Sequence, residues 1–553
     1  MSFPSQLSRL RGRFLWRSFQ RRTNRPEAAQ QELLNRLLAA NRDTAFGRCH
    51  GFSSMATTKD FQEGVPVGDY EAYRPWIDQV IQGEHRVLTA DQPYMFTLTS
   101  GTGGQPKLIP VNRSTKTNSS RLSALWLYRA LADHPQLLEG KALAVVSPAV
   151  EGHTATGIPF GSASGHIYQH ASWYLRRRYA VPYDVFAIKD FEAKYYTIMR
   201  IAIEQNVSFI ATPNPSTILR LVTTADHNRE QIIRDIYDGT LSAKFDIETV
   251  IRQQLKSTLN PNVKRARELE AMLTSNESFA PWYYWPNLKL VGCWKGGSVG
   301  TTISRIEPWF RPGMPFRDIG YLSSEAQVTL PVQDAGSAGI LALDSNFYEF
   351  IPEADIDSSN PTALTVGQLQ AGESYYILIT SPTGLYRYDI NDVVKVSGYY
   401  QKTPILEFVR KGRDMVNLEG EKLHVGQLIQ AVESAQRSTG VKVEYFRGVG
   451  NVGASRYDLK IELAEGSLND ELVKQLGREI DSRLAELNIE YDQKRRSGRL
   501  HAPHVQVMAK GWSSRRVKAK LDRGLRDVQF KDNLLGLPDE EDRPSDVIRD
   551  LSL

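Results

Sequence analysis

The sequence reads Thr99-Ser100-Gly101-Thr102-Gly103-Gly104-Gln105-Pro106-Lys107 directly after the apolar, β-prone run Tyr94-Met95-Phe96-Thr97-Leu98. This order predicts a strand that ends in a flexible loop carrying two hydroxyl groups and one lysine. Glycines let backbone N–H groups converge on an anion, Ser100 and Thr102 add hydroxyl donors, and Lys107 adds a positive charge. The stretch therefore predicts a phosphate-binding loop, and the alternative is an ordinary surface turn.

The order of residues in this loop excludes two common phosphate motifs. No Lys-Ser or Lys-Thr pair follows a glycine at the Walker spacing, and the dinucleotide fingerprint is absent. The loop resembles the phosphate loop of the adenylate-forming superfamily, which includes acyl-CoA ligases, peptide-synthetase adenylation domains and luciferases. The resemblance implies that the triphosphate of ATP is bound by Thr99, Ser100, Gly101, Thr102, Gly103 and Lys107.

Further motifs surround the loop between residues 44 and 110. They are Thr44-Ala45-Phe46-Gly47-Arg48, Val65-Pro66-Val67, Tyr70, Tyr73, Pro75-Trp76-Ile77, Gly83-Glu84 and Lys107-Leu108-Ile109-Pro110. Together they resemble the entry region of the auxin-responsive Gretchen Hagen family of acyl acid amido synthetases, in its bacterial type. That family is a branch of the adenylate-forming superfamily.

The composition is that of an ordinary globular protein, with 41% hydrophobic and 24% charged residues and a net charge of +5. So small a charge gives no support to a nucleic-acid partner. Cys49 and Cys293 are the two cysteines and have no zinc-like spacing, so a reducing, cytoplasmic location is expected. The sequence contains no apolar run of about twenty residues, which argues against a membrane span, and the amino terminus lacks a secretory signal.

Short apolar runs beyond the loop alternate with helical stretches, at residues 142–147, 208–211, 288–292 and 315–320. This alternation is typical of buried parallel strands joined by crossover helices. Ligands bind at the carboxyl ends of such strands, where the polar motifs of this chain also occur. Residues 339–408 are dense in aromatic and β-branched side chains, which predicts antiparallel hairpins.

The length of 553 residues exceeds that of a single compact core. A cut near residue 410 leaves a carboxy-terminal part with two helical stretches and a hairpin at 441–463. We therefore expect an α/β protein with mixed, largely parallel sheets and a β-rich portion in residues 1–410, which would bind ATP and the acyl acid. Residues 411–553 would form a smaller, mobile α+β domain.

Residues 1–25 carry seven arginines and no acidic residue, with Leu7, Leu10 and Phe14 at helical spacing. This pattern predicts a basic amphipathic helix that ends before Pro26. It has two interpretations. The helix makes a peripheral contact with anionic lipid, or it docks its apolar stripe on the body of the protein.

The pentapeptide Tyr321-Leu322-Ser323-Ser324-Glu325 follows the strand expected at 315–320. Alone, it fits a loop that enters a helix. In the family that the chain resembles, the same pattern implies that Tyr321 lies against adenine, Ser324 near the α-phosphate and Glu325 on Mg²⁺, a hard cation that prefers oxygen ligands.

The segment Tyr388-Asp389-Ile390-Asn391-Asp392 resembles the family pattern Tyr-Arg-Val-Gly-Asp, with Asp389 in place of arginine and Asn391 in place of glycine. The resemblance implies that Asp392 accepts hydrogen bonds from both ribose hydroxyls. The alternative is a β-turn aspartate that caps a hairpin. Earlier, Gly296 and Gly297 follow a strand and resemble the adenine-pocket segment, where backbone approaches the base closely; a plain strand-to-helix turn is the alternative.

Two further motifs lie in the carboxy-terminal part. Gly412-Arg413-Asp414 resembles the superfamily hinge, which implies that Arg413 contacts the ribose while the domain rotates between half-reactions. Gln529-Phe530-Lys531 resembles the terminal lysine motif, which makes Lys531 a catalytic residue together with Lys107. Asp532-Asn533 replaces the family's Val-Pro, so Lys518 and Lys520 remain alternatives.

These motifs predict an ATP-dependent acyl acid amido synthetase that uses Mg²⁺, adenylates a small carboxylic acid and transfers the acyl group to an amino acid or other amine. An acyl-CoA ligase shares the first half-reaction and is the first alternative. A catalytically inactive nucleotide-binding or membrane-associated protein is the second, because several motif positions are altered.

Overall fold

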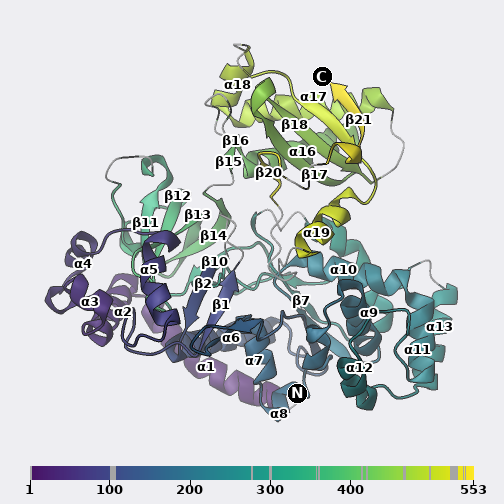
Figure 1. The fold of residues 1–553 in the computed structure, drawn as a ribbon, viewed down its shortest axis with the longest axis horizontal. Coiled ribbons are helices and arrows are strands. Elements are labelled where there is room, and N and C mark those ends of the chain that lie inside the picture. Colours follow the sequence, from purple (N-terminus) through teal and green to yellow (C-terminus); the bar gives the residue numbers. More distant parts are fainter. Residues whose placement is uncertain are drawn as a thin grey trace. The chain divides into compact units, whose positions relative to one another are not determined.

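The protein is described here from a computed structural model, which covers residues 3–99, 107–275, 278–297, 302–356, 358, 361–412, 415–416, 418, 421, 423–464, 469–496, 498, 500–522, 533–539, 541 and 543–553. The chain forms two compact units, Met1–Phe408 and Val409–Leu553 (Figure 1). Below they are called the N-terminal unit and the C-terminal unit. None of the helices in the described ranges is both long and apolar enough to span a membrane.

The helices of the N-terminal unit are mostly short. Their bounds are α1 Phe3–Thr23, α2 Pro26–Asn41, α3 Ala45–Cys49, α4 Thr58–Gly64, α5 Tyr70–Ile81, α6 Arg113–Asp133, α7 Ala163–Gln169, α8 Trp173–Arg176, α9 Phe191–Ala202, α10 Pro215–His227, α11 Arg229–Asp238, α12 Thr249–Leu255, α13 Val263–Ser275, α14 Pro281–Tyr284 and α15 Ile303–Ile306.

The first helix docks on the body of the protein, which is one of the two predicted interpretations. It does not dock through the predicted apolar stripe. Leu10 and Phe14 are 71% and 74% exposed, while Trp16 and Phe19 are buried against α6 and neighbouring strands. A side-chain carbon at Gly12 would lie 2.4 Å from Tyr128, so glycine permits the close approach of α1 and α6. Large aromatic side chains bury more apolar area than a leucine, which favours this face.

A four-stranded parallel sheet confirms the predicted apolar runs. Its order is β3 (Lys141–Ala144), β6 (Val207–Ala211), β7 (Leu290–Gly292) and β8 (Phe316–Arg317), with every neighbouring pair parallel. Figure 1 shows helices α9 to α13 gathered beside this sheet. The carboxyl ends of β7 and β8 lead directly into two of the predicted binding motifs.

The strands on either side of the expected phosphate loop belong to a second, mixed sheet, while residues 100–106 lie outside the described part of the chain. Strands β1 (Met95–Thr99) and β2 (Lys107–Val111) form an antiparallel hairpin in which Thr99 pairs with Lys107. Strands β5 (Pro159–Gly161) and β4 (Gly152–His153) complete the order β2-β1-β5-β4, with β5 parallel to β1. Strand β2 is therefore an edge strand, and Lys107 is its first residue.

The predicted hairpins of residues 339–408 are confirmed as part of a six-stranded antiparallel sheet. Its strands, in spatial order, are β11 Phe347–Pro352, β12 Ser374–Thr380, β13 Tyr388–Tyr400, β14 Thr403–Lys411, β10 Gly339–Leu341 and β9 Thr329–Leu330. One face packs on α2, α4 and α5 through a large aromatic and aliphatic core. Apolar burial of this kind is the main stabilising contribution to the unit.

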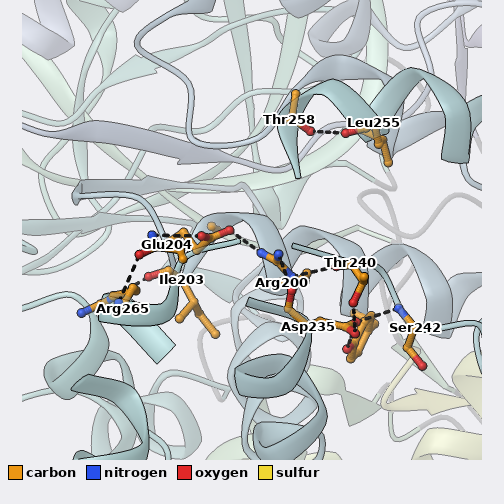
Figure 2. A network of polar contacts seen from close by, with 12 residues as sticks. Arg200, Ile203, Glu204, Asp235, Thr240, Ser242, Leu255, Thr258 and Arg265 are labelled. Atoms are coloured by element: carbon orange, nitrogen blue, oxygen red, sulfur yellow. Dashed lines mark hydrogen bonds and ion pairs between the residues drawn. The ribbon is translucent and has the colours of Figure 1, made fainter. Parts of the chain in front are cut away.

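A buried polar network joins α9, α11 and the loop after α11 (Figure 2). Arg200 donates hydrogen bonds to the backbone carbonyls of Asp235 and Thr240, and its guanidinium also pairs with Glu204. The Asp235 carboxylate accepts from Tyr196 Oη at 2.7 Å and from Ser242 N at 2.6 Å. Buried charges are tolerated where every group has partners of this kind.

The C-terminal unit is an α+β fold with its own core. Its five-stranded sheet has the order β20 Leu535–Gly536, β17 Val443–Asn451, β18 Arg456–Leu463, β19 His504–Met508 and β21 Val547–Ser552. A two-stranded ribbon consists of β15 Met415–Val416 and β16 Leu423–His424, and the helices are α16 Val425–Thr439, α17 Asp470–Leu487, α18 Ile489–Arg496 and α19 Trp512–Asp522.

Candidate functional site

The carboxyl ends of the parallel strands β7 and β8 carry two of the predicted segments. Asp318 follows β8 and accepts hydrogen bonds from Lys295 N and Gly320 N, both at 2.6 Å, so it ties the two strand ends together. Gly297 has φ +61°, a left-handed conformation that favours glycine. At Gly296 a side-chain carbon would lie 3.3 Å from the carbonyl oxygen of Phe408. The adjacent glycines therefore meet a backbone requirement at this strand end.

Burial raises the pKa of the Asp318 carboxyl group to about 6, and the nearby charge of Glu407 adds to the increase. The two backbone N–H donors and Lys295 oppose it. The ammonium group of Lys295 donates to the carbonyl oxygens of Phe316 and Asp334. The sequence assigned no role to Asp318, because only its packing against these donors distinguishes it from other aspartates.

The segment Tyr321–Val328 is a tight hairpin rather than a loop that enters a helix. Val328 N donates to Tyr321 O at its base, and Ser323 N donates to Ala326 O at its tip. Ser324 and Glu325 occupy the two central positions of this turn, and both are partly exposed. The hairpin thus presents a hydroxyl and a carboxylate together, while Tyr321 is held at its base.

Tyr321 and Asp392, predicted from motifs 71 positions apart, meet directly. The Tyr321 hydroxyl donates to Asp392 Oδ2 at 2.5 Å, and both residues are buried. The Tyr321 ring lies 5.3 Å from that of Phe408, centroid to centroid. Burial raises the pKa of the Tyr321 phenol, and the negative charge of Asp392 adds to the increase, so this group is a donor at neutral pH. The segments that were predicted to contact adenine and ribose therefore meet through this hydrogen bond.

Asn391, which replaces the glycine of the family pattern, has a backbone conformation that glycine adopts readily. Its φ is +56°, in the left-handed region where asparagine is the best tolerated residue with a side chain. Asn391 N donates to Asp389 Oδ1 at 2.7 Å, which closes an Asx-type turn. Both departures from the pattern, Asp389 and Asn391, therefore serve the same local turn that precedes Asp392.

Lys107 lies at the base of the β1–β2 hairpin, where its backbone pairs with Thr99. Its ammonium group lies 5.4 Å from the centroid of the Tyr70 ring. Tyr70, at the start of α5, accepts a hydrogen bond from Leu108 N at 2.9 Å. Tyr70 is part of the family resemblance, but no role is predicted for it from sequence, because its partner lies 38 residues later on a strand.

Electrostatic effects connect these members. Burial raises the pKa of Tyr388, and the charge of Glu325 adds to the increase, followed by Asp69 and Tyr70. Glu325 also contributes to the raised pKa of Tyr321. The surroundings of Tyr388 thus include a carboxylate of the Tyr321–Val328 hairpin and the tyrosine whose ring contacts Lys107.

Several predicted site residues lie outside the described part of the chain: Ser100, Gly101, Thr102, Gly103, Arg413 and Lys531. The alternatives to Lys531 are described. Lys518 is exposed and Lys520 partly buried on α19, within the C-terminal unit.

Within the described ranges, no group of three or more His, Cys, Asp or Glu side chains is arranged to hold a metal ion. Mg²⁺ that is bound with a nucleotide is usually held by one or two carboxylates and by substrate phosphates rather than by an all-protein cage. Glu325, at a partly exposed hairpin tip, is suited to supply such a carboxylate.

Comparison with known protein families gives matches over most of the chain. The GH3 family N-terminal domain matches residues 15–314, the central domain 339–411 and the C-terminal domain 426–535. Among curated relatives, indole-3-acetic acid-amido synthetase GH3.4 of Arabidopsis thaliana is 25% identical over 438 residues, which cover 75% of this chain and 72% of the relative.

Solved structures show the same fold. The acyl acid amido synthetase AtGH3.15 in complex with 2,4-DB superimposes with a TM-score of 0.85 at 19% identity, covering 98% of this chain and 97% of that one. A 2-hydroxyisobutyryl-CoA ligase in its postadenylation state gives a TM-score of 0.52 at 14% identity, over 94% and 92% of the two chains. The fold is thus that of adenylate-forming enzymes. With its three domains matched in order along the chain, this protein belongs to the GH3 family, the Gretchen Hagen family that its motifs indicated.

Proposed function

We propose that this protein is an ATP-dependent acyl acid amido synthetase, a ligase that forms a carbon–nitrogen bond through an acyl-adenylate. The observation that supports the proposal is the Tyr321–Asp392 hydrogen bond, because it joins two buried residues that are each predicted to bind the nucleotide, within a GH3-family chain. The relative named above as an indole-3-acetic acid-amido synthetase supports a small carboxylic acid and an amino acid or other amine as substrates.

The reaction requires two steps, because a carboxylate is a poor electrophile. The substrate carboxylate attacks the α-phosphorus of ATP and pyrophosphate leaves; the amine then attacks the acyl carbon and AMP leaves. The protein acts mainly by positioning and by charge neutralisation. Lys107 and the loop from Thr99 would hold the triphosphate, Gly296, Gly297 and Tyr321 the adenine, and Ser324 the α-phosphate.

The remaining roles belong to the same proposal. Asp392 would accept the ribose hydroxyls, and Glu325 would hold Mg²⁺, which neutralises phosphate charge when bound. Residues 1–410 would bind ATP and the acyl acid, and residues 411–553 would rotate between half-reactions, bringing Arg413 to the ribose and Lys531 to the α-phosphate. Assignment to the bacterial type of the family remains a prediction.

The decisive experiment measures acid-dependent ATP–pyrophosphate exchange with a panel of small carboxylic acids. Lys107→Ala and Glu325→Ala are each expected to reduce exchange about 100-fold, because each removes stabilisation of the negative charge on the phosphates during transfer of the adenylyl group. Lys59→Ala is the matched control, since Lys59 is exposed and pairs with Glu63 on α4, away from these motifs. Wild-type protein without exchange for any acid would favour the inactive alternative.

The acceptor separates the proposal from the acyl-CoA ligase alternative. With the acid that supports exchange, amino acids are expected to give an amide and AMP, detected by mass spectrometry. Product formation with coenzyme A alone would identify the protein as an acyl-CoA ligase instead.

We also propose that α1 contacts anionic membrane surfaces. The observation that favours it is the pair Leu10 and Phe14, exposed on a helix that also exposes Arg11, Arg13, Arg17 and Arg21. Apolar side chains ringed by arginines suit the headgroup region of an anionic bilayer.

Sedimentation with phosphatidylglycerol and phosphatidylcholine vesicles tests this contact. Preferential binding to the anionic vesicles is expected, and Leu10→Ser/Phe14→Ser should abolish it. Val250→Ser, which changes an exposed apolar residue of α12, is the control. Equal binding to both vesicles, or no binding to either, would refute the contact.

A further inference from the structure

Tyr70 lies at the start of α5, close to the strand that begins with Lys107 and to the segment that leads to Asp392. It is the first residue of α5, and the side chain of Asp69 caps that helix by accepting from Glu71 N and Ala72 N. The cap fixes the direction in which the buried Tyr70 side chain leaves the helix. The position of the Tyr70 ring is therefore determined by α5.

The hydroxyl of Tyr70 holds the strand that begins with Lys107. In the β1–β2 hairpin, β2 is the edge strand, so the N–H of Leu108 points away from β1. Tyr70 Oη accepts this N–H at 2.9 Å. A buried backbone donor at a sheet edge requires such a partner. The hydrogen bond thus anchors the residue adjacent to Lys107.

The ring of Tyr70 holds the side chain of Lys107 as well. The Lys107 ammonium lies 5.4 Å and the Arg74 guanidinium 4.9 Å from the ring centroid, distances typical of cation–π contacts. Lys107 also contributes to the lowered pKa of Glu71, after the larger effect of Arg74, which places its charge beside this end of α5. Tyr70 therefore contacts the side chain of Lys107 and holds the backbone of the residue that follows it.

The same turn is bound to the segment that carries Asp392. Gly68 pairs with Tyr388: Gly68 N donates to Arg387 O at 3.3 Å, and Asp389 N donates to Gly68 O at 2.9 Å. The start of α5 consequently touches the ribose motif through Gly68 and the phosphate lysine through Tyr70.

We infer that Tyr70 is a positioning residue for Lys107, which fixes the distance between the phosphate end and the ribose end of the ATP site. This inference rests on the proposed function. It assigns Tyr70 no contact with substrate; its effect on ATP passes through Lys107.

The test compares Tyr70→Phe, which keeps the ring and removes the hydroxyl, with wild type in ATP binding by calorimetry and in ATP–pyrophosphate exchange. We expect the Kd and the KM for ATP to rise about fivefold, because one hydrogen bond is lost. The KM for the acid should stay unchanged. Tyr94→Phe is the matched control, because Tyr94 precedes the same hairpin and no change is expected there.

A double-mutant cycle with Lys107→Ala separates positioning from general destabilisation. If Tyr70 acts through the lysine, Tyr70→Phe adds no further loss in the Lys107→Ala background. Equal losses in both backgrounds, or unchanged ATP binding in Tyr70→Phe, would overturn the inference. Wild type that binds ATP without exchange would refute the proposed function alone, and wild type that binds no ATP would refute both.

Discussion

The backbone φ angle at Asn391 suits both asparagine and glycine, the residue of the family pattern at this position. At φ +56° the strain of a side chain is small for asparagine and absent for glycine, but large for a β-branched residue. Asn391→Gly is expected to change the free energy of unfolding by no more than about 1 kcal/mol. Asn391→Val is expected to lower it by about 2 kcal/mol and to raise KM for ATP, because Asp392 follows directly.

Urea unfolding and exchange kinetics measure these effects. Lys395→Val, which places the same side chain at an exposed position of β13, is the control and should leave both unchanged. Equal stability of Asn391→Val and wild type would mean that the turn adjusts without cost.

Asp318 gives the N-terminal unit a defined pH dependence. Its pKa is about 6 in the folded protein and about 3.8 in the absence of burial. The folded state therefore holds this proton more tightly than the unfolded state, and the free energy of unfolding falls as pH rises from about 4 to about 6. The full change is on the order of 3 kcal/mol, with no further loss from this group above pH 6.

Chemical unfolding of wild type and Asp318→Asn between pH 4 and pH 8 tests this expectation. The variant lacks the titrating group, so the stability difference between the two proteins should vary below pH 6 and stay constant above it. A difference that is constant over the whole range would contradict the burial of a titrating carboxyl group at this position.

The helices α9 and α11 depend on the polar network of Figure 2. Asp235→Ala would leave the Tyr196 hydroxyl and Ser242 N–H buried without their acceptor, and is expected to lower the free energy of unfolding by about 3 kcal/mol. Asp238→Ala, at an exposed position of the same helix, should change it by less than about 0.5 kcal/mol. Thermal unfolding of both variants would measure the contrast, and similar small losses would show that water replaces the carboxylate.

Elements with one dominant pattern were predictable from sequence, whereas the face by which they pack was not. The runs at 208–211 and 288–292 are parallel strands because continuous apolar residues suit a sheet covered on both sides. The helix α1 was predicted as well, but spacing selected Leu10 and Phe14 for its docking face. In the structure Trp16 and Phe19 form the docking face, because they pack against α6 and its neighbouring strands. Local periodicity does not reveal which segment a helix will pack against.

Some residues of the candidate site were predictable from sequence motifs, and others were found only from the structure. Tyr321, Glu325 and Asp392 were predicted through motifs, and the structure adds how the first and last of them are joined. Asp318 was not predicted, and Tyr70 was named only in the family resemblance, because each accepts a hydrogen bond from the backbone of a distant segment, Lys295 N and Leu108 N respectively. Contacts of this kind follow only from the fold.

The two units have separate hydrophobic cores, which predicts two unfolding transitions for the whole chain. Ile377→Ala, in the core of β12, is expected to lower the stability of one transition by about 3 kcal/mol. Leu476→Ala, in the core of α17, should lower the other by a similar amount. Differential scanning calorimetry measures both, and a single transition shifted equally by the two variants would contradict independent units.

The edge strand β2 also affects how copies of this protein behave toward one another. An open sheet edge is a template for aggregation, because its outward N–H groups recruit strands from other molecules. Along β2 the outward N–H of Leu108 is taken by Tyr70, and two residues later Pro110 has none to offer. The hairpin is thus protected from intermolecular strand addition at high concentration, by the same tyrosine that anchors its lysine.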